Sequence, residues 1–280
     1  MDTDANEPSS RLQCQGTVDP LGVQAIRQIL ANGICQTAAY HEATSSTNTW
    51  ALNESVEADS LPRLVVADSQ TAGRGRLGRN WHSDQGTLTF SLRVSATALN
   101  LSSAVSPMIA LAAGMGVADA IEHRLAPLRV QLKWPNDVYL GNRKIAGILV
   151  EATGPKAERV VVGVGINIDT RFEQAAEPLS ATATSLSEAA TTGLTRYELL
   201  PSVVQQIVAR INQLNQQTSE FLDEYRTRCY LTGKTIRIER PDRIFTGTVQ
   251  GVATDGGLTV VTPTGPETIY SGVIEILAAK

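Results

Sequence analysis

Apolar side chains recur along the chain at two different periods, which predict a mixture of strands and helices. Residues 87–94 alternate apolar and polar side chains, the pattern of a strand with one buried face. Residues 21–31 place apolar side chains at helical spacing, and residues 104–125 form a small-residue segment typical of a buried helix. On the same criteria we predict strands at 37–42, 63–68, 130–133, 138–140, 143–151 and 159–168, and helices at 47–54 and 195–229.

The last part of the chain follows a different pattern. Five short strands are predicted there between turns rich in glycine and proline, at 234–239, 243–250, 257–262, 266–270 and 272–277. Such a run of short strands is typical of a small barrel that forms a separate domain. We therefore divide the chain into a polar tail at 1–20, expected to be mobile, a large domain at 21–230 and a barrel at 231–280.

Composition narrows the class of protein. With 280 residues and 42% hydrophobic side chains, the chain can bury a core and is not globally disordered. A net charge of −4 and only 5% aromatic residues argue against a protein devoted to nucleic-acid binding. Three cysteines without a CxxC pair fit a reducing compartment. Since there is no signal sequence and no apolar segment of the roughly 20 residues a membrane span needs, we predict a cytoplasmic protein that does not enter a membrane.

The loop between the predicted strands 63–68 and 87–94 carries the strongest chemical signal. Its residues 73–78 match GxGxxG, but a strand rather than a helix follows them, which excludes a dinucleotide-binding fingerprint. Arg74, Arg76 and Arg79 lie in a stretch without acidic residues, and Trp81 adds an apolar surface. Guanidinium groups on a glycine-rich backbone suit a phosphate or a carboxylate. A solvated basic loop is the alternative, but the glycines and the tryptophan favour an anion-binding site.

Four shorter motifs add polar groups at the ends of predicted elements. Lys133-Trp-Pro-Asn-Asp137 places a cation, an amide and a carboxylate at a strand end, although an ordinary turn would explain it as well. Lys144 leads an apolar strand, either as an edge residue or as a site cation. Ser46-Thr-Asn48 stands where a helix begins, which N-capping alone would explain. Gly163–Asn167 ends a strand with an amide, and its glycines leave room for a ligand, whereas the three histidines are isolated and predict no metal site.

Together with Gln70 and the arginine-rich loop, these motifs resemble those of the biotin protein ligase family, in the same order over residues 46–167. The C-terminal barrel matches that family as well. The resemblance implies an α/β catalytic domain with a mixed, largely antiparallel sheet flanked by helices, followed by an SH3-like barrel. It also implies an enzyme that uses ATP and Mg²⁺ to convert biotin to biotinyl-5′-AMP. The enzyme would then transfer biotin to a lysine of the biotin carboxyl carrier protein of acetyl-CoA carboxylase or a related carboxylase.

The resemblance also implies roles for individual residues. The catalytic residues would be Lys144, Arg76, Lys133 and Asp137. Biotin would be bound by Ser46, Thr47, Asn48, Gln70, Arg74, Gly75, Arg76 and Lys144. The adenylate would be bound by Arg79, Trp81, Asn136 and Asn167. Among these, Lys144 would approach the biotin carboxyl oxygen and the phosphate, residues 74–76 would order over bound biotin, and Asp137 would orient the acceptor lysine. The metal ligands stay unassigned.

Three other functions are consistent with parts of the sequence. A lipoate or octanoate ligase or transferase shares the catalytic fold, although the arginine-rich loop and the barrel favour biotin. A repressor would need a winged helix before Ser46, where 45 residues with one predicted helix stand, so we expect no specific DNA binding. A binding module without activity would not need the full set of cations. The identity of the carrier protein, the oligomeric state (a homodimer included) and the role of residues 1–20 stay open.

Overall fold

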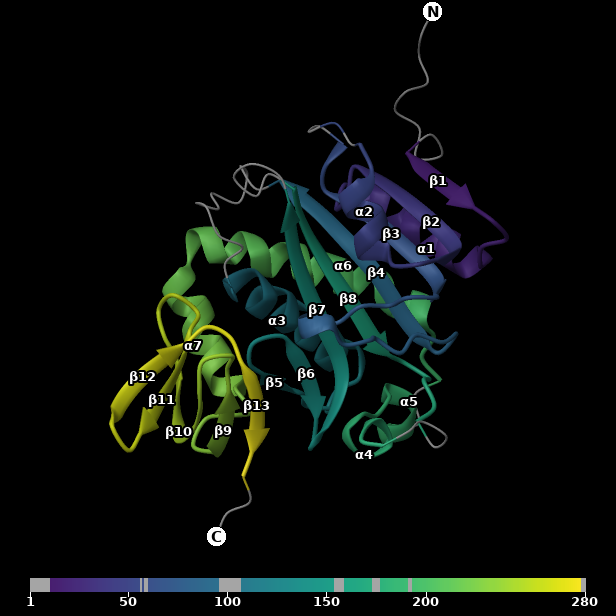
Figure 1. Cartoon of the computed structure of the whole chain (residues 1–280). Coiled ribbons are helices and arrows are strands. Elements are labelled where there is room, and N and C mark those ends of the chain that lie inside the picture. Colours follow the sequence, from purple (N-terminus) through teal and green to yellow (C-terminus); the bar gives the residue numbers. More distant parts are fainter. Residues whose placement is uncertain are drawn as a thin grey trace, which may run out of the picture.

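An eight-stranded mixed sheet forms the centre of the larger part of the molecule (Figure 1). The computed structural model describes residues 11–55, 57, 60–95, 107–153, 159–172, 177–190 and 193–277. In the strand order β1-β2-β3-β4-β8-β7-β6-β5, the first two pairs are parallel and the others antiparallel, which confirms the predicted sheet type. The strands are β1 (Leu12–Gln15), β2 (Thr37–Thr44), β3 (Arg63–Gln70), β4 (Thr87–Ser95), β5 (Gln131–Lys133), β6 (Asp137–Leu140), β7 (Arg143–Thr153) and β8 (Arg159–Asn167).

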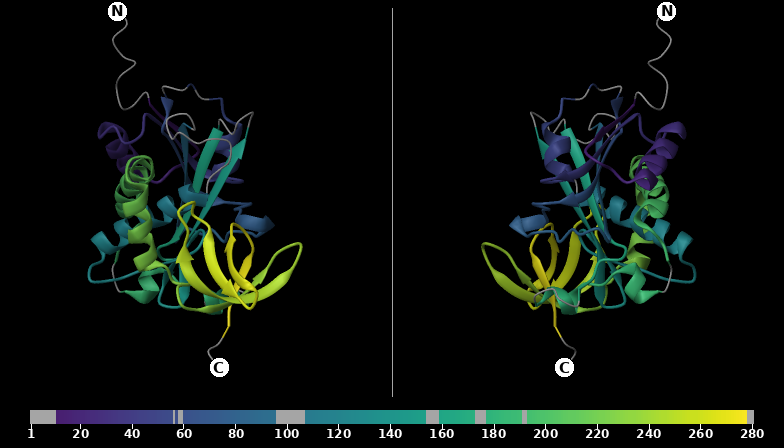
Figure 2. Two further views of the ribbon diagram at one scale, coloured as in Figure 1. Left: turned by 90° about the vertical axis from the view of Figure 1, so that its left-hand side faces the viewer. Right: turned by 90° about the vertical axis from the view of Figure 1, so that its right-hand side faces the viewer.

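Different helices cover the two faces of this sheet. Helices α1, α3 and α6 pack together on one face, and Figure 2 shows α6, in green, lying along that side. The short helix α2 packs on the other face, over Val65 and Val161. None of the described helices is long and apolar enough to cross a membrane. The helices are α1 (Pro20–Ala31), α2 (Thr47–Asn53), α3 (Pro107–Arg124), α4 (Leu179–Thr182), α5 (Leu186–Ala189), α6 (Arg196–Gln216) and α7 (Thr218–Arg228).

Strand β8 shows how the sequence creates two different faces. Successive side chains of a strand point to opposite sides of the sheet. The even-numbered positions Val160, Val162, Val164 and Ile166 belong to the main hydrophobic core beneath α3 and α6. The alternate positions include Gly163, Gly165 and Asn167, which line a cavity on the α2 side. The apolar run that predicted a central strand therefore has a second face, on which Gly163, Gly165 and Asn167 line the cavity.

The prediction for the N-terminal tail needs correction. The second half of the tail predicted at 1–20 is ordered, because β1 pairs in parallel with β2 and Pro20 begins α1, whereas residues 1–10 lie outside the described residues. Strand β1 is short and largely exposed, so it has no apolar alternation that periodicity could detect. The helical region predicted at 195–229 is present as two helices, α6 and α7, which meet at Gln217, whose backbone (φ −144°, ψ 56°) is not helical. A capping box of Thr195 and Glu198 begins α6.

The predicted small barrel is a five-stranded antiparallel sheet in the order β12-β11-β10-β9-β13 (yellow in Figures 1 and 2). Its buried side chains, such as Ile236 and Leu258, belong to the same hydrophobic core as the large sheet. Trp134 Nε1 donates a hydrogen bond to Gly256 O at 2.9 Å and further joins the two parts. The strands are β9 (Thr235–Glu239), β10 (Ile244–Val252), β11 (Leu258–Thr262), β12 (Gly265–Ile269) and β13 (Val273–Ile276).

Candidate active site

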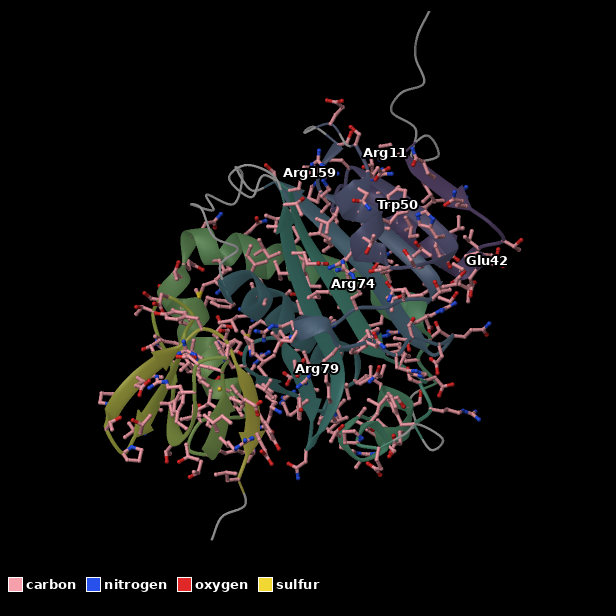
Figure 3. All side chains as sticks on the ribbon, in the orientation of Figure 1. Arg11, Glu42, Trp50, Arg74, Arg79 and Arg159 are labelled. Carbon is pink, nitrogen blue, oxygen red and sulfur yellow. The ribbon has the colours of Figure 1, made fainter. Side chains whose placement is uncertain are left out.

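A cavity of about 1100 Å³ lies over the face of the large sheet that α2 covers. Figure 3 shows Arg74 and Arg79 near the middle of this face, in front of β7 and β8. Every residue that the sequence analysis selected for the site lines the cavity. These residues are Ser46, Thr47, Asn48, Gln70, Arg74, Gly75, Arg76, Arg79, Trp81, Lys133, Asn136, Asp137, Lys144 and Asn167. Motifs spread over 122 positions, from 46 to 167, thus form one site.

The N-terminus of α2 contributes uncharged polar groups to the cavity. Ser46 is the N-cap residue, but its side chain makes no capping hydrogen bond, so N-capping does not explain its hydroxyl. Thr47 N and Oγ1 lie 2.8 and 3.2 Å from Gln70 Oε1 and fix that amide at the end of β3. Ser91 of β4 places a buried hydroxyl 2.8 Å from Thr47 Oγ1. This part of the site therefore offers hydroxyl and amide groups held in place by neighbouring strands.

Glycines on β7 and β8 let side chains of the site lie directly on the sheet. A Cβ at Gly163 would come within 2.1 Å of Asn48 Oδ1, and one at Gly165 within 2.3 Å of the Trp81 indole. A Cβ at Gly147 would lie 3.0 Å from the same indole. From the sequence we expected Gly163 and Gly165 to leave room for a ligand. That expectation is wrong in detail, because Asn48 and Trp81 fill the space and form the floor of the cavity.

The arginine loop (residues 73–81) folds back on itself above this floor. Gly75 N donates to Arg79 O at 2.7 Å, and Trp81 N donates to Gly73 O at 2.9 Å. Leu77 at the tip has a left-handed backbone (φ 55°), and two thirds of its surface is exposed. The loop therefore holds its arginines on a short hairpin-like turn rather than on an extended segment.

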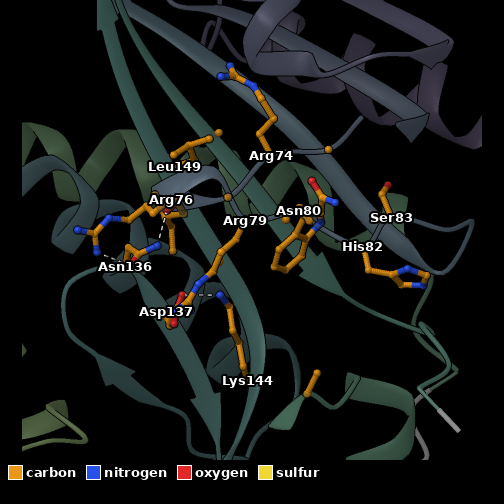
Figure 4. A pocket seen from close by; sticks show the side chains of 18 of the residues that line it. Arg74, Arg76, Arg79, Asn80, His82, Ser83, Asn136, Asp137, Lys144 and Leu149 are labelled. Atoms are coloured by element: carbon orange, nitrogen blue, oxygen red, sulfur yellow. Dashed lines mark hydrogen bonds and ion pairs between the residues drawn. The ribbon is translucent and has the colours of Figure 1, made fainter. Parts of the chain in front are cut away.

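The arginines of the loop reach different parts of the site (Figure 4). Arg74 Nη2 donates to Glu151 Oε2 at 2.7 Å, and Arg76 Nη1 donates to Asn136 Oδ1 at 3.1 Å. Burial lowers the pKa of Arg76, and this effect is opposed by the nearby carboxylate of Asp137. The loop thus distributes positive charge along the cavity.

Strands β6 and β7 bring a cation and a carboxylate together below the arginine loop. Lys144 Nζ lies 2.6 Å from Asp137 Oδ1, the ion pair drawn in Figure 4. The same Nζ lies 5.4 Å from the centre of the Trp81 ring. Because β7 lies between β6 and β8, Lys144 does not belong to an edge strand. Lys144 instead lines the cavity, so of the two alternatives left open by the sequence the structure favours the site cation.

Lys133 lies beside this ion pair and against an aromatic ring. Its Nζ donates to Tyr139 Oη at 3.1 Å and lies 5.1 Å from the centre of that ring. Burial lowers the pKa of Lys133; the charges of Lys144 and Arg79 lower it further, while Asp137 raises it. A bound anion would therefore stabilise this group of cations.

The two asparagines predicted for the adenylate also fix the walls of the cavity. Asn136 Nδ2 donates to Ile148 O at 2.8 Å and so ties the turn before β6 to β7. Asn167 Nδ2 donates to Thr184 O at 3.0 Å and holds the segment between α4 and α5 against the end of β8. Each amide thus has a structural contact in addition to the role that the resemblance implies.

Sequence reasoning missed some contributors to the site. Glu151 of β7 accepts hydrogen bonds from Asn48 and Arg74, and Ser91 of β4 donates one to Asn48. The available sequence signal for Glu151 was a charged residue directly after the apolar run 145–150. Residues 272–274, at the start of β13, line the cavity from the C-terminal sheet. Nothing in their local sequence indicates this, because the contact depends on how the two sheets pack.

The described residues contain no group of three or more histidine, cysteine, aspartate or glutamate side chains arranged to hold a metal ion. Asp137 is the one carboxylate among the described residues that line the cavity.

Comparison with known proteins relates both parts of the chain to one family. The model of the biotin/lipoate A/B protein ligase family matches residues 40–167, and that of the biotin protein ligase C-terminal domain matches residues 231–277. The bifunctional ligase/repressor BirA of Bacillus subtilis is 30% identical over 240 residues, which cover 85% of this chain and 73% of that protein. The biotin–[acetyl-CoA-carboxylase] ligase of Mycobacterium tuberculosis is 32% identical over 236 residues, 79% of this chain and 85% of that protein.

Solved structures give the same relationship. The biotin protein ligase from Aquifex aeolicus, in complex with biotin and ATP, superimposes with a TM-score of 0.75 at 27% sequence identity. The match covers 86% of this chain and 99% of that chain.

Proposed function

The chain belongs to the biotin protein ligase family, and from this premise we propose that it attaches biotin to a protein lysine in two steps. In the first step a carboxylate oxygen of biotin attacks the α-phosphorus of ATP. The bond from that phosphorus to the bridging oxygen breaks, which yields biotinyl-5′-AMP and pyrophosphate. In the second step the neutral amine of a carrier lysine attacks the acyl carbon; AMP leaves and the amine loses a proton.

The observation that carries this proposal is the set of cations around one cavity. The described residues that line the cavity include five cationic side chains and one carboxylate, that of Asp137. The cations are Arg74, Arg76, Arg79, Lys133 and Lys144. A carboxylic acid is already ionised near neutral pH, so adenylation needs no base. It needs two anions brought together, aligned, and stabilised as charge develops on the phosphoryl oxygens. A positively charged cavity meets that requirement.

We assign the biotin ring to the α2 side of the cavity. Ser46, Thr47, Asn48 and Gln70 supply hydroxyl and amide groups that suit a ureido ring, which has two N–H donors and one carbonyl acceptor. The Ser46 hydroxyl makes no capping hydrogen bond to α2 and lines the cavity, where it can bind a ligand. The acid end of biotin then extends along β7 toward Lys144.

The remaining cations act on the reacting groups and on the adenylate. Lys144 contacts the biotin carboxyl oxygen and the phosphate, and its ion pair with Asp137 holds it ready at the cavity wall. Arg79 has no ion-pair partner among the described residues and is free to bind phosphate. Trp81, Asn136 and Asn167 bound the adenylate. Residues 74–76 close over bound biotin and exclude water from the mixed anhydride.

Asp137 has a second task in the transfer step. The acceptor lysine, with a pKa of about 10.4 when free, must lose its proton before it can attack. Asp137 lies in the cavity as an acceptor for that ammonium group, and its pairing with Lys144 keeps it close to the reacting centre. It orients the incoming lysine and assists the loss of its proton.

Mg²⁺ would enter with ATP. This ion usually keeps several waters and binds through one or two carboxylates together with substrate phosphates. The cavity fits this mode, because Asp137 supplies one carboxylate and no protein cage is needed. When bound, Mg²⁺ would reduce the negative charge of the triphosphate.

The partner is a biotin carboxyl carrier protein of acetyl-CoA carboxylase or a related carboxylase. The name of the Mycobacterium tuberculosis relative supports this choice. We place the reaction in the cytoplasm, because it uses ATP and because all three cysteines are free thiols, as expected in a reducing compartment. The absence of specific DNA binding stays a prediction, checked by a shift assay with operator DNA, and light scattering would decide whether a homodimer forms.

Substrate competition tests the proposal. The protein is incubated with ATP and with biotin, lipoate or octanoate, and the acyl-adenylate is detected by mass spectrometry. We expect biotinyl-5′-AMP alone; preferential adenylation of lipoate or octanoate, or none of any acid, would contradict the proposal. Arg76→Ala should release or hydrolyse more of the intermediate, and retention equal to the parent would contradict the closing role of the loop.

A further inference from the structure

Glu151 on β7 connects two separate parts of the site through one carboxylate oxygen. Its Oε2 accepts a hydrogen bond from Asn48 Nδ2 at 2.8 Å and another from Arg74 Nη2 at 2.7 Å. Asn48 belongs to α2, and Arg74 belongs to the arginine loop. Both residues line the cavity, whereas Glu151 lies behind them and is not part of its lining.

Glu151 determines which way the Asn48 amide faces. The two amide hydrogens of Asn48 point to acceptors, Leu149 O at 3.1 Å and Glu151 Oε2 at 2.8 Å. The amide oxygen lies 2.6 Å from Ser91 Oγ and directly above Gly163. An amide turned the other way would place its oxygen against an ionised carboxylate and a backbone carbonyl, which is unfavourable. Asn48 is therefore restricted to presenting an acceptor oxygen.

This orientation matters for a ureido ligand. An amide oxygen has two acceptor positions, and Ser91 uses one of them. The second can accept from a ureido N–H. If Glu151 did not hold the amide nitrogen, Asn48 could rotate and present donors to the same position. Glu151 thus makes Asn48 an acceptor, and not a donor, toward the ring, although Glu151 itself does not line the cavity.

The second hydrogen bond of Glu151 anchors the arginine loop. Arg74 leads this loop, and the bond from its guanidinium is charge-assisted on both sides. The loop is closed on itself by backbone hydrogen bonds, so a fixed Arg74 restrains the whole turn. One oxygen of Glu151 therefore connects Asn48, which contacts the ring in this assignment, with the arginine loop that covers the ring.

We propose that Glu151 is a positioning residue of the ligase, which fixes the Asn48 amide as an acceptor for the ureido ring and anchors the arginine loop through Arg74. The inference rests on the proposed function, because it takes biotin as the ligand of this site. Glu151 acts through these two side chains and does not touch the substrate.

Steady-state kinetics of pyrophosphate release test the proposal. Glu151→Gln keeps the size of the side chain but removes its charge, and Glu151→Ala removes both contacts. We expect the KM for biotin to rise about tenfold in Glu151→Gln and up to about 100-fold in Glu151→Ala, as for the loss of charge-assisted hydrogen bonds. The KM for ATP should change less than about threefold. Equal changes in both KM values, or none, would overturn the proposal.

The C-terminal sheet provides a matched control. Glu267 pairs there with Arg243, and the two side chains are 25% and 45% exposed, close to the 23% and 43% of Glu151 and Arg74. Neither residue of this control pair lines the cavity. Glu267→Gln should leave both KM values at the parental level. A rise in the biotin KM as large as that of Glu151→Gln would mean that any lost acid–arginine pair has this effect, and would overturn the proposal.

Two further measurements separate positioning from general damage. If Glu151 acts through Asn48, adding Glu151→Ala to Asn48→Ala should raise the biotin KM much less than Glu151→Ala does in the parent; full additivity would contradict the proposal. Cyclic carbamate analogues, in which oxygen replaces either ureido N–H, should be rejected less strongly by Glu151→Ala than by the parent. Unchanged discrimination against both analogues would also contradict it.

Failure of this inference is distinguishable from failure of the proposed function. If the parent protein forms no biotinyl-5′-AMP, the proposed function fails before any variant is compared. If the parent forms it and Glu151→Gln has a parental KM for biotin, the function stands and the role of Glu151 is wrong.

Discussion

The substitution Gly165→Ala tests whether a glycine at this position of β8 is needed to seat Trp81. A Cβ at this position would lie 2.3 Å from Trp81 Cε2 and 2.5 Å from both Cζ2 and Nε1. Carbon atoms in contact are normally about 3.5–4.0 Å apart, so three ring atoms would be more than about 1 Å too close. Position 165 lies on a central strand with little freedom to move, whereas Trp81 ends a loop. We therefore expect the indole to leave the floor of the cavity.

The size of the effect follows from the cost of overpacking. Inserting a methyl group into a filled site typically costs about 1–3 kcal/mol. If the transition state requires Trp81 in this position, the cost is added to the activation free energy. The value of kcat/KM for adenylation then falls about 5- to 150-fold. The assay is biotin-dependent pyrophosphate release, with thermal unfolding measured on the same preparations.

Gly114 offers the same substitution in a site that accepts it. A Cβ there would lie 3.6 Å from Leu132 Cδ2 and 3.8 Å from Ile148 Cδ1, which is ordinary contact. Gly114→Ala should keep parental activity and gain up to about 1 kcal/mol of stability, because Gly114 lies within α3. The reasoning is refuted if Gly165→Ala retains kcat/KM within twofold of the parent, or if Gly114→Ala loses as much activity.

Further predictions concern stability and its dependence on pH. Arg93 donates to two backbone carbonyls at the C-terminus of α2, so Arg93→Met should lower the free energy of unfolding by about 1–3 kcal/mol, measured in urea. Trp134→Phe leaves Gly256 O without its donor and should cost about 1–2 kcal/mol in the same experiment; an unchanged value would show that this bond does not stabilise the contact between the sheets. Burial lowers the pKa of Lys133 below its usual 10.5, so the folded protein releases this proton at a lower pH than the unfolded chain does. Stability should therefore gain a contribution as pH rises toward 10.5, and Lys133→Met should lack that gain in unfolding curves measured across this range.

The elements that form the site were predictable because each has a strong local signal. Residues 87–94 form the predicted strand, β4, although both of its faces are buried and not one. The short strand β1 gave no such signal, because its stability depends on backbone pairing with β2 rather than on apolar side chains. The helical spacing of apolar residues continues through Gln217, so the break between α6 and α7 at this residue could not be seen in the sequence.

The lining of the cavity could be predicted from the sequence, but the contacts between the lining residues could not. Arginines, lysines and amides in glycine-rich turns indicated the lining of the cavity. Gly163 and Gly165 suggested free space, and only the fold shows that Asn48 and Trp81 occupy it. Glu151 lies far from Arg74 in sequence, so their ion pair depends on how the arginine loop crosses β7.

The central claim is that the cations of this cavity activate biotin with ATP for transfer to a carrier. The most direct measurement is ATP-dependent transfer of biotin to a carrier domain by the parent, by Lys144→Ala and by Arg143→Ala. Arg143 precedes Lys144 on β7, pairs with Glu188 and does not line the cavity. We predict transfer by the parent and by Arg143→Ala, and a loss of about 10²- to 10³-fold in Lys144→Ala. No transfer by the parent, or full transfer by Lys144→Ala, would contradict the account.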